Sequence, residues 1–219
     1  EIAVFTLQNP APKVVTARID RSISAFVWMP DGQSLLLLTA SGVRTGLEEI
    51  GMDGESRAVP LPSAITSVSE FAIHPEGLIA MVAGTPRSSA EIYLYDPVSS
   101  KTERISSYNT FIDSLWLGKS EGMEWPVGNG MYADGVVTYP PDFEEGKKYP
   151  LVLFIHGGPT AASNLTILPF VQQLAAQGWI VFQPNYRGSS NKGNRFQRAI
   201  EGDAGKGPGK DIMKGIKAL

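Results

Sequence analysis

The stretch Pro150-Leu-Val-Leu-Phe-Ile-His-Gly-Gly-Pro159 decides the fold of the second half of the chain. The five residues after Pro150 are all apolar, which is typical of a central strand that is buried on both faces of a parallel sheet. Two glycines follow and predict a tight turn at the carboxyl end of that strand, at the edge where open α/β sheets bind ligands. The stretch therefore predicts an α/β fold with a candidate site at residues 156–159.

A βαβ unit is predicted from this strand onward. Residues 169–177 predict a helix, because Pro169 suits the first helical position and Gly178 the position past a helix end. Trp179-Ile-Val-Phe182 predicts a second buried strand, parallel to the first with a right-handed crossover. The motif Asn185-Tyr-Arg-Gly-Ser189 follows this strand, so we expect it at the same sheet edge as the two glycines. The apolar spacing in residues 210–219 predicts a last helix.

The first 109 residues carry a different pattern, which repeats. Phe26-Val-Trp-Met-Pro-Asp-Gly32 and Phe71-Ala-Ile-His-Pro-Glu-Gly77 each precede an apolar run, and their prolines lie 45 residues apart. Short strands at a period of about 40 to 50 residues are typical of propeller blades. We expect residues 1–16 to close one blade, and 17–62 and 63–109 to form the next two. A β-sandwich, whose strands also recur at short intervals, is the alternative.

Composition argues against several kinds of site and partner. The chain has no Cys and only two His, so we expect no disulfide, no metal and no cofactor. A net charge of −3 gives no electrostatic reason to expect nucleic acid or a membrane surface as partner, and no apolar run is long enough to span a membrane. We expect no signal peptide in this chain and expect its start to be truncated. The sequence identifies no compartment and only weakly favours the cytoplasm.

The order of the motifs resembles the prolyl oligopeptidase family. His156-Gly-Gly-Pro159, a helix, a strand into Asn185–Ser189, and Glu201-Gly-Asp203 before the last helix follow one another. The ordered set is more specific than the first motif, which occurs widely in esterases. The resemblance covers residues 120–219, looks closest to the acylaminoacyl-peptidase and dipeptidyl-peptidase-like branch, and agrees with the repeats before it.

The resemblance implies a fold with two parts. A partial β-propeller, contributing its C-terminal blades, would be followed by the N-terminal part of an α/β-hydrolase domain. We expect the blades over residues 1–109 and a linker with the first hydrolase strand over 110–130. The N-terminal half of the hydrolase domain would then occupy residues 131–219.

The resemblance also implies roles for five residues. The backbone N–H of Gly158 would be an oxyanion-hole donor, and Gly157 would allow the turn. Tyr186, Arg187 and Gly188 would form a loop that shapes the edge of the active site. We expect Arg187 to act mainly through hydrogen bonds to neighbouring loops.

The resemblance also implies that the nucleophile, acid and base of a serine hydrolase are absent from this chain. The only near match to a Gly-x-Ser-x-Gly elbow, Gly188-Ser-Ser-Asn-Lys192, fails because Lys192 stands where the second glycine is needed. In the family the base lies far downstream, so His156 belongs to the turn. All three groups would lie beyond Leu219, on the remainder of the polypeptide or on a complementary chain, and we expect the chain alone to be inactive. The parent protein would be a serine peptidase cleaving short peptides; an oligomer is left open.

Two other functions stay open. An esterase on the same hydrolase fold would use a similar glycine turn, although a preceding propeller does not suit it. A propeller scaffold with a degenerate hydrolase domain is the non-catalytic alternative. Only sequence beyond residue 219 would discriminate it from the peptidase.

Overall fold

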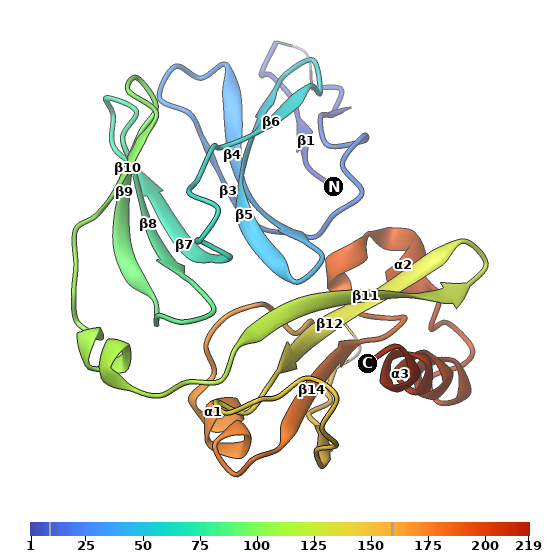
Figure 1. Ribbon diagram of the computed structural model, residues 1–219. Helices are drawn as coiled ribbons and strands as arrows, with labels where there is room; N and C mark the ends of the chain where they lie inside the picture. Colours follow the sequence, from blue (N-terminus) through green and yellow to red (C-terminus); the bar gives the residue numbers. More distant parts are fainter. Residues whose placement is uncertain (9, 159) are drawn as a thin grey trace.

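The computed structural model describes residues 1–8, 10–158 and 160–219. Its strands fall into two groups, with β1 to β10 in one lobe and β11 to β14 in the other, as Figure 1 shows. Pro159, the last residue of the glycine motif, lies outside the described residues. Among the described residues, no helix has the length and apolar content needed to cross a membrane.

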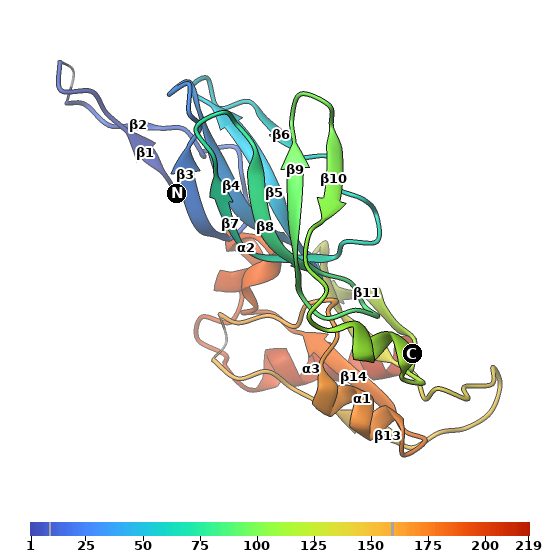
Figure 2. The same cartoon turned by 90° about the vertical axis from the view of Figure 1, so that its left-hand side faces the viewer.

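Two four-stranded antiparallel sheets and a two-stranded ribbon make up the first lobe. Their strands are β1 (Ala3–Val4), β2 (Lys13–Val14), β3 (Ile23–Trp28), β4 (Ser34–Ser41), β5 (Arg44–Gly51), β6 (Ser56–Ala58), β7 (Ser67–Ile73), β8 (Ile79–Gly84), β9 (Glu91–Asp96) and β10 (Lys101–Arg104). Each large sheet is a meander of four consecutive strands, visible side by side in Figure 2. This is the topology of a propeller blade, whereas the Greek-key connections of a sandwich mix strands between sheets. The described residues contain no closed ring of blades.

Strand β4 is buried on both faces because it lies between packed layers. Leu36 and Leu38 belong to an apolar cluster shared with the second sheet. Leu35 and Leu37 point the other way and pack in a cluster with Val15, beside the ribbon. Face-to-face packing of successive sheets therefore explains why this run is apolar at every position.

The two turn glycines adopt the backbone conformation that the repeated motif predicts. Gly32 has a φ of 68° and Gly77 a φ of 92°, in the left-handed region that other residues resist. The Gly32 N–H donates to Met29 O at 2.9 Å, and the Gly77 N–H donates to His74 O at 2.8 Å. Both predicted turns are confirmed.

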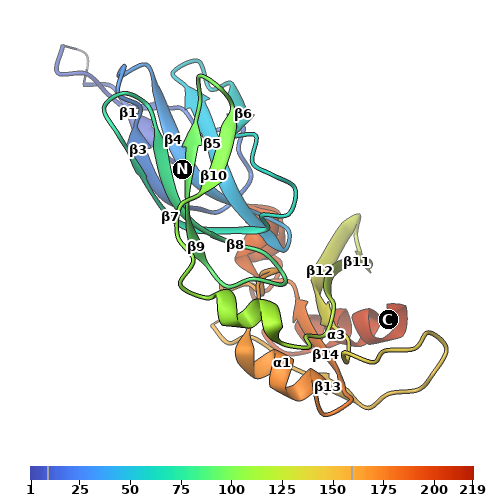
Figure 3. The same cartoon turned by 60° about the vertical axis from the view of Figure 1, so that its left-hand side comes forward.

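The second lobe is a four-stranded sheet of order β11-β12-β14-β13 with helices on both faces. The remaining elements are η1 (Thr110–Ser114), β11 (Ser120–Gly128), β12 (Met131–Thr138), β13 (Leu151–Leu153), α1 (Pro169–Ala175), β14 (Ile180–Asn185), η2 (Ser190–Lys192), α2 (Asn194–Arg198) and α3 (Lys206–Ala218). Strands β13 and β14 are parallel and α1 connects them, so the predicted βαβ unit is confirmed. Helices α1 and α3 flank β14 from opposite sides in Figures 1 and 3.

The prediction that residues 150–155 form a strand buried on both faces is wrong in this structure. Strand β13 is short, lies at the end of the sheet and pairs with β14 alone. Phe154 is 38% exposed and Ile155 48% exposed. The physical reason is position: burial of an apolar strand depends on the elements beside it, and the described residues place none on the outer edge of β13.

Helix α1 is confirmed, and its buried face includes a polar residue. Phe170 is exposed, whereas Gln172 is buried beside Val171 and Ala175. The Gln172 side chain imitates a backbone pair, because Oε1 accepts from the Gly118 N–H at 2.9 Å and Nε2 donates to the Gly118 carbonyl at 3.2 Å. A buried amide is stable where both of its ends are paired.

Candidate active site

Residues 156–158 form the predicted bend, which follows β13 after Phe154 and Ile155. Gly158 has a φ of 52°, and its carbonyl accepts a hydrogen bond from the Ala161 N–H at 2.7 Å. Gly157 and Gly158 are both exposed, and a Cβ added to either would meet no atom within 4 Å. The bend is therefore exposed beyond the carboxyl end of a parallel strand, and neither N–H has an acceptor among the described residues.

The loop after β14 holds His156, the residue before the two glycines. The Tyr186 hydroxyl donates to the His156 carbonyl at 2.8 Å, and the two rings stack with centroids 4.8 Å apart. The Oγ of Ser189 lies 3.0 Å from His156 Nε2. Burial holds the pKa of His156 below its usual value, which favours a neutral ring near neutral pH. The structure thus brings together two motifs that the sequence predicted at one sheet edge.

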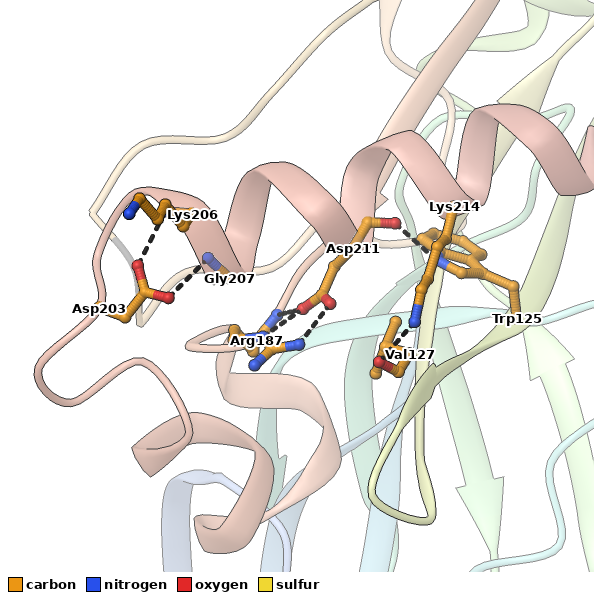
Figure 4. Close-up of polar contacts among 8 residues, drawn as sticks. All are labelled: Trp125, Val127, Arg187, Asp203, Lys206, Gly207, Asp211 and Lys214. Carbon is orange, nitrogen blue, oxygen red and sulfur yellow. Dashed lines mark hydrogen bonds and ion pairs between the residues drawn. The ribbon is translucent and has the colours of Figure 1, made fainter.

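Arg187 bonds to a helix, not to a loop as the sequence analysis expected. Its backbone N–H, Nε and Nη2 donate to the Asp211 carboxylate on α3 at 3.1, 2.7 and 2.7 Å (Figure 4). Asp211 is fully buried, and its hydrogen bonds raise the pKa of Arg187. Sequence analysis missed Asp211. A signal was available: it lies four residues from both Gly207 and Gly215, small residues that mark a closely packed helix face.

The backbone conformation and the close neighbours of residue 188 leave room only for glycine. Gly188 has a φ of 102°, and an added Cβ would lie 2.7 Å from Ile200 Cδ1. Its N–H donates to Phe196 O at 3.0 Å, and the Ser189 N–H donates to Tyr186 O at 2.9 Å. These bonds close the loop tightly around residues 186–189.

A buried polar cluster supports the start of the same loop. Asn185 Nδ2 donates to Asp134 Oδ1 at 2.8 Å and to Ser163 O at 3.0 Å, while its Oδ1 accepts from the Ser163 N–H at 2.7 Å. Asn191 Nδ2 also donates to Asp134 Oδ1, at 2.7 Å. Burial raises the pKa of Asp134. This cluster, which the sequence analysis did not find, fixes the segment after the glycine bend to strands β12 and β14.

The first lobe contacts the second beside this loop. The Gly42 N–H donates to Asn191 O at 3.1 Å, and Ser22 Oγ donates to Ser190 O. A cavity of about 560 Å³ lies between the lobes here, with Arg21, Asp134 and Lys192 in its wall.

Among the described residues, no three His, Cys, Asp or Glu side chains are grouped to hold a metal ion.

Comparison with known sequences gives consistent relatives. The model of the prolyl oligopeptidase family matches residues 169–219. Dipeptidyl-peptidase 5 of Aspergillus fumigatus is 30% identical over 202 residues, covering 89% of this chain and 28% of the relative. An uncharacterised peptidase of Bacillus subtilis is 28% identical over 193 residues, covering 87% of this chain and 29% of the relative. The chain thus spans less than a third of the length of these relatives.

Solved structures agree on the fold. Pyrococcus horikoshii acylaminoacyl peptidase matches with a TM-score of 0.79 at 21% identity, covering 96% of this chain and 32% of that one. A puromycin-hydrolyzing peptidase of Mycobacterium tuberculosis matches with a TM-score of 0.74 at 18% identity, covering 97% of this chain and 35% of that one. At these identities the likeness is one of fold.

Proposed function

This chain belongs to the prolyl oligopeptidase family, and from that premise we propose that it is part of a serine peptidase that cleaves short peptides. In this proposal residues 1–109 are blades of a propeller, and residues 131–219 are the N-terminal half of a hydrolase domain. The nucleophile, acid and base are supplied by polypeptide outside this sequence. The names of the relatives and the family match support the peptidase class.

The observation that carries the proposal is the exposed glycine bend. When a serine attacks a peptide carbonyl, the carbonyl oxygen gains negative charge, and preformed N–H donors stabilise it. Gly158 is exposed and its N–H has no acceptor among the described residues, as this role requires. One such donor contributes about 2.7 to 4 kcal/mol to the transition state. Gly157 allows the bend, Tyr186 and Ser189 hold His156 before it, and residues 186–188 shape the edge of the site.

The position of the bend also supports a peptidase. It follows the carboxyl end of β13, parallel to β14, where open α/β sheets bind ligands. The first lobe contacts Ser190 and Asn191, immediately after the loop. Blades so close to the site would restrict entry to short peptides.

The proposal is tested on the full-length protein that contains this chain. A fluorophosphonate probe should label one serine, and mass spectrometry should place that serine outside residues 1–219. Labelling should persist in Ser190→Ala, a serine within the failed elbow motif, and labelled protein should lose hydrolysis of short peptide amides. Absence of labelling together with absence of hydrolysis would refute the proposal and favour a scaffold. Cleavage of simple esters without peptides would favour an esterase.

A further inference from the structure

We propose that Asp211, on helix α3, is a positioning residue for the glycine bend, acting through Arg187 and Tyr186. The inference rests on the proposed function, because it gives the bend a catalytic purpose. It concerns a different question, namely what holds the bend in its working geometry. Asp211 lies in a helix, far in sequence from both motifs of the site.

The first step is the pairing of Asp211 with Arg187. The Asp211 carboxylate is fully buried. A buried carboxylate without a partner is strongly unfavourable, so Asp211 holds its cationic partner in a fixed position. Arg187 gives it a bidentate side-chain contact and also its own backbone N–H. The backbone bond matters most here, because it fixes the main chain of the loop as well as a side chain.

The second step leads from Arg187 to the bend. Tyr186 adjoins Arg187, and its hydroxyl holds the His156 carbonyl while its ring stacks on the imidazole at an interplanar angle of 11°. Ser189, which is fully buried, reaches the same imidazole from the other end of the loop. The His156 carbonyl belongs to the peptide group that contains the Gly157 N–H. A displacement of Tyr186 would therefore rotate the His156–Gly157 peptide group. This group directly precedes the peptide group that carries the Gly158 N–H.

The third step anchors the helix that carries Asp211. Trp125 Nε1 donates to the Asp211 carbonyl at 2.8 Å, and Lys214 Nζ donates to Val127 O at 2.8 Å (Figure 4). Asp203 accepts from the N–H groups of Lys206 and Gly207 at the start of the helix. Helix α3 is thus fixed to strand β11. The position of the bend relative to the sheet therefore depends on this helix.

The test compares three variants of the full-length protein, normalised to the active sites titrated with a fluorophosphonate. Asp211→Asn removes the charge that holds Arg187, and Tyr186→Phe removes only the bond to His156. Glu201→Gln is the matched control, an exposed acidic residue shortly before α3 whose side chain pairs with Arg198. Because a misplacement of about 1 Å can reduce a rate about 100-fold, we expect kcat per titrated site to fall at least about 10-fold in the first two variants. KM should stay within about twofold, and the control within about twofold of the wild type.

Two further readouts separate positioning from a merely structural role. The Ki of a peptide aldehyde, whose adduct places an oxygen at the bend, should rise by the same factor as kcat falls, whereas the Ki of a product peptide should not change. Hydrogen exchange at the Ala161 amide, which bonds to Gly158 O, should become faster in Asp211→Asn and Tyr186→Phe but not in the control. Unchanged kcat per site, unchanged aldehyde affinity and unchanged exchange would overturn the inference.

The outcomes also separate this inference from the proposed function. A wild type without label or hydrolysis refutes the peptidase assignment, and the exchange measurement still decides whether Asp211 positions the bend. If Asp211→Asn fails to fold, Tyr186→Phe decides, because it leaves the ion pair intact. An active wild type with an unaffected Tyr186→Phe variant would refute the positioning route alone.

Discussion

Substituting Gly215 by alanine tests how closely helix α3 packs on the sheet. Gly215 is buried, and an added Cβ would lie 2.7 Å from Trp125 Cζ2 and 2.8 Å from Phe182 Cζ. Both rings are almost fully buried, at 1% and 0% exposure, and they contact each other edge to face with centroids 5.3 Å apart. Neither ring has free space to move into, so the helix must shift or the rings must leave their packed positions.

The magnitude follows from two opposing effects. Alanine is about 1 kcal/mol more favourable than glycine inside a helix. Overpacking a filled core costs about 1 to 3 kcal/mol. We therefore expect Gly215→Ala to lower the free energy of unfolding by about 0 to 2 kcal/mol. Gly209→Ala is the matched control, because Gly209 lies in the same helix, is exposed and has no atom within 4 Å of an added Cβ. That variant should gain about 1 kcal/mol.

The assay is urea unfolding of the full-length protein followed by tryptophan fluorescence, with both variants measured beside the wild type. The two free energies of unfolding should differ by about 1 to 3 kcal/mol, the overpacking contribution alone. Equal stabilisation by both substitutions would show that the helix is not seated against Trp125 and Phe182 as described. It would also remove the anchoring on which the role of Asp211 depends.

Three other predictions concern polar groups of the second lobe. Gln172→Ala should lower the free energy of unfolding by about 2 kcal/mol or more, because it leaves both polar groups of the Gly118 backbone buried without partners. Gln173→Ala, at the exposed neighbouring position, should change the free energy of unfolding little in the same urea assay. Burial raises the pKa of Asp134 above 3.8, so its contribution to stability is present below that pH and is lost as pH rises through the raised pKa. Asp134→Asn should therefore gain stability relative to the wild type as the pH rises from 3.8 through the raised pKa, measured by urea unfolding at a series of pH values. A difference independent of pH would contradict this. Burial and the hydrogen bond to Glu121 raise the pKa of Tyr139 to about 12. The phenolate absorbance of the wild type and of Tyr139→Phe should therefore be the same near pH 10 in an ultraviolet titration.

Features set by local chemistry were predictable from the sequence. The turns at Gly32 and Gly77 were predicted correctly because proline and glycine restrict the backbone wherever they occur. Helix α1 was found for the same reason, from Pro169 at its start and Gly178 beyond its end. The parallel strands around it followed from two apolar runs at βαβ spacing.

Features set by distant partners were not predictable in this way. The pairing of Arg187 with Asp211 joins residues that no local pattern connects, and only the glycines on either side of Asp211 indicated a packed helix face. The exposure of β13 also depends on neighbours in space, because an apolar run has the same sequence at the centre and at the end of a sheet. Gln172 is buried since its amide matches the Gly118 backbone, which lies 54 residues away.

The most direct test of the central claim replaces the amide at residue 158 by an ester, using glycolic acid in place of Gly158 in the full-length protein. This change removes the single N–H donor and adds no atoms to the open space around the bend. We predict that kcat for a short peptide falls about 100- to 1,000-fold while KM is little changed. An ester variant whose kcat stays within about twofold of the wild type would show that the Gly158 amide does not stabilise the oxyanion.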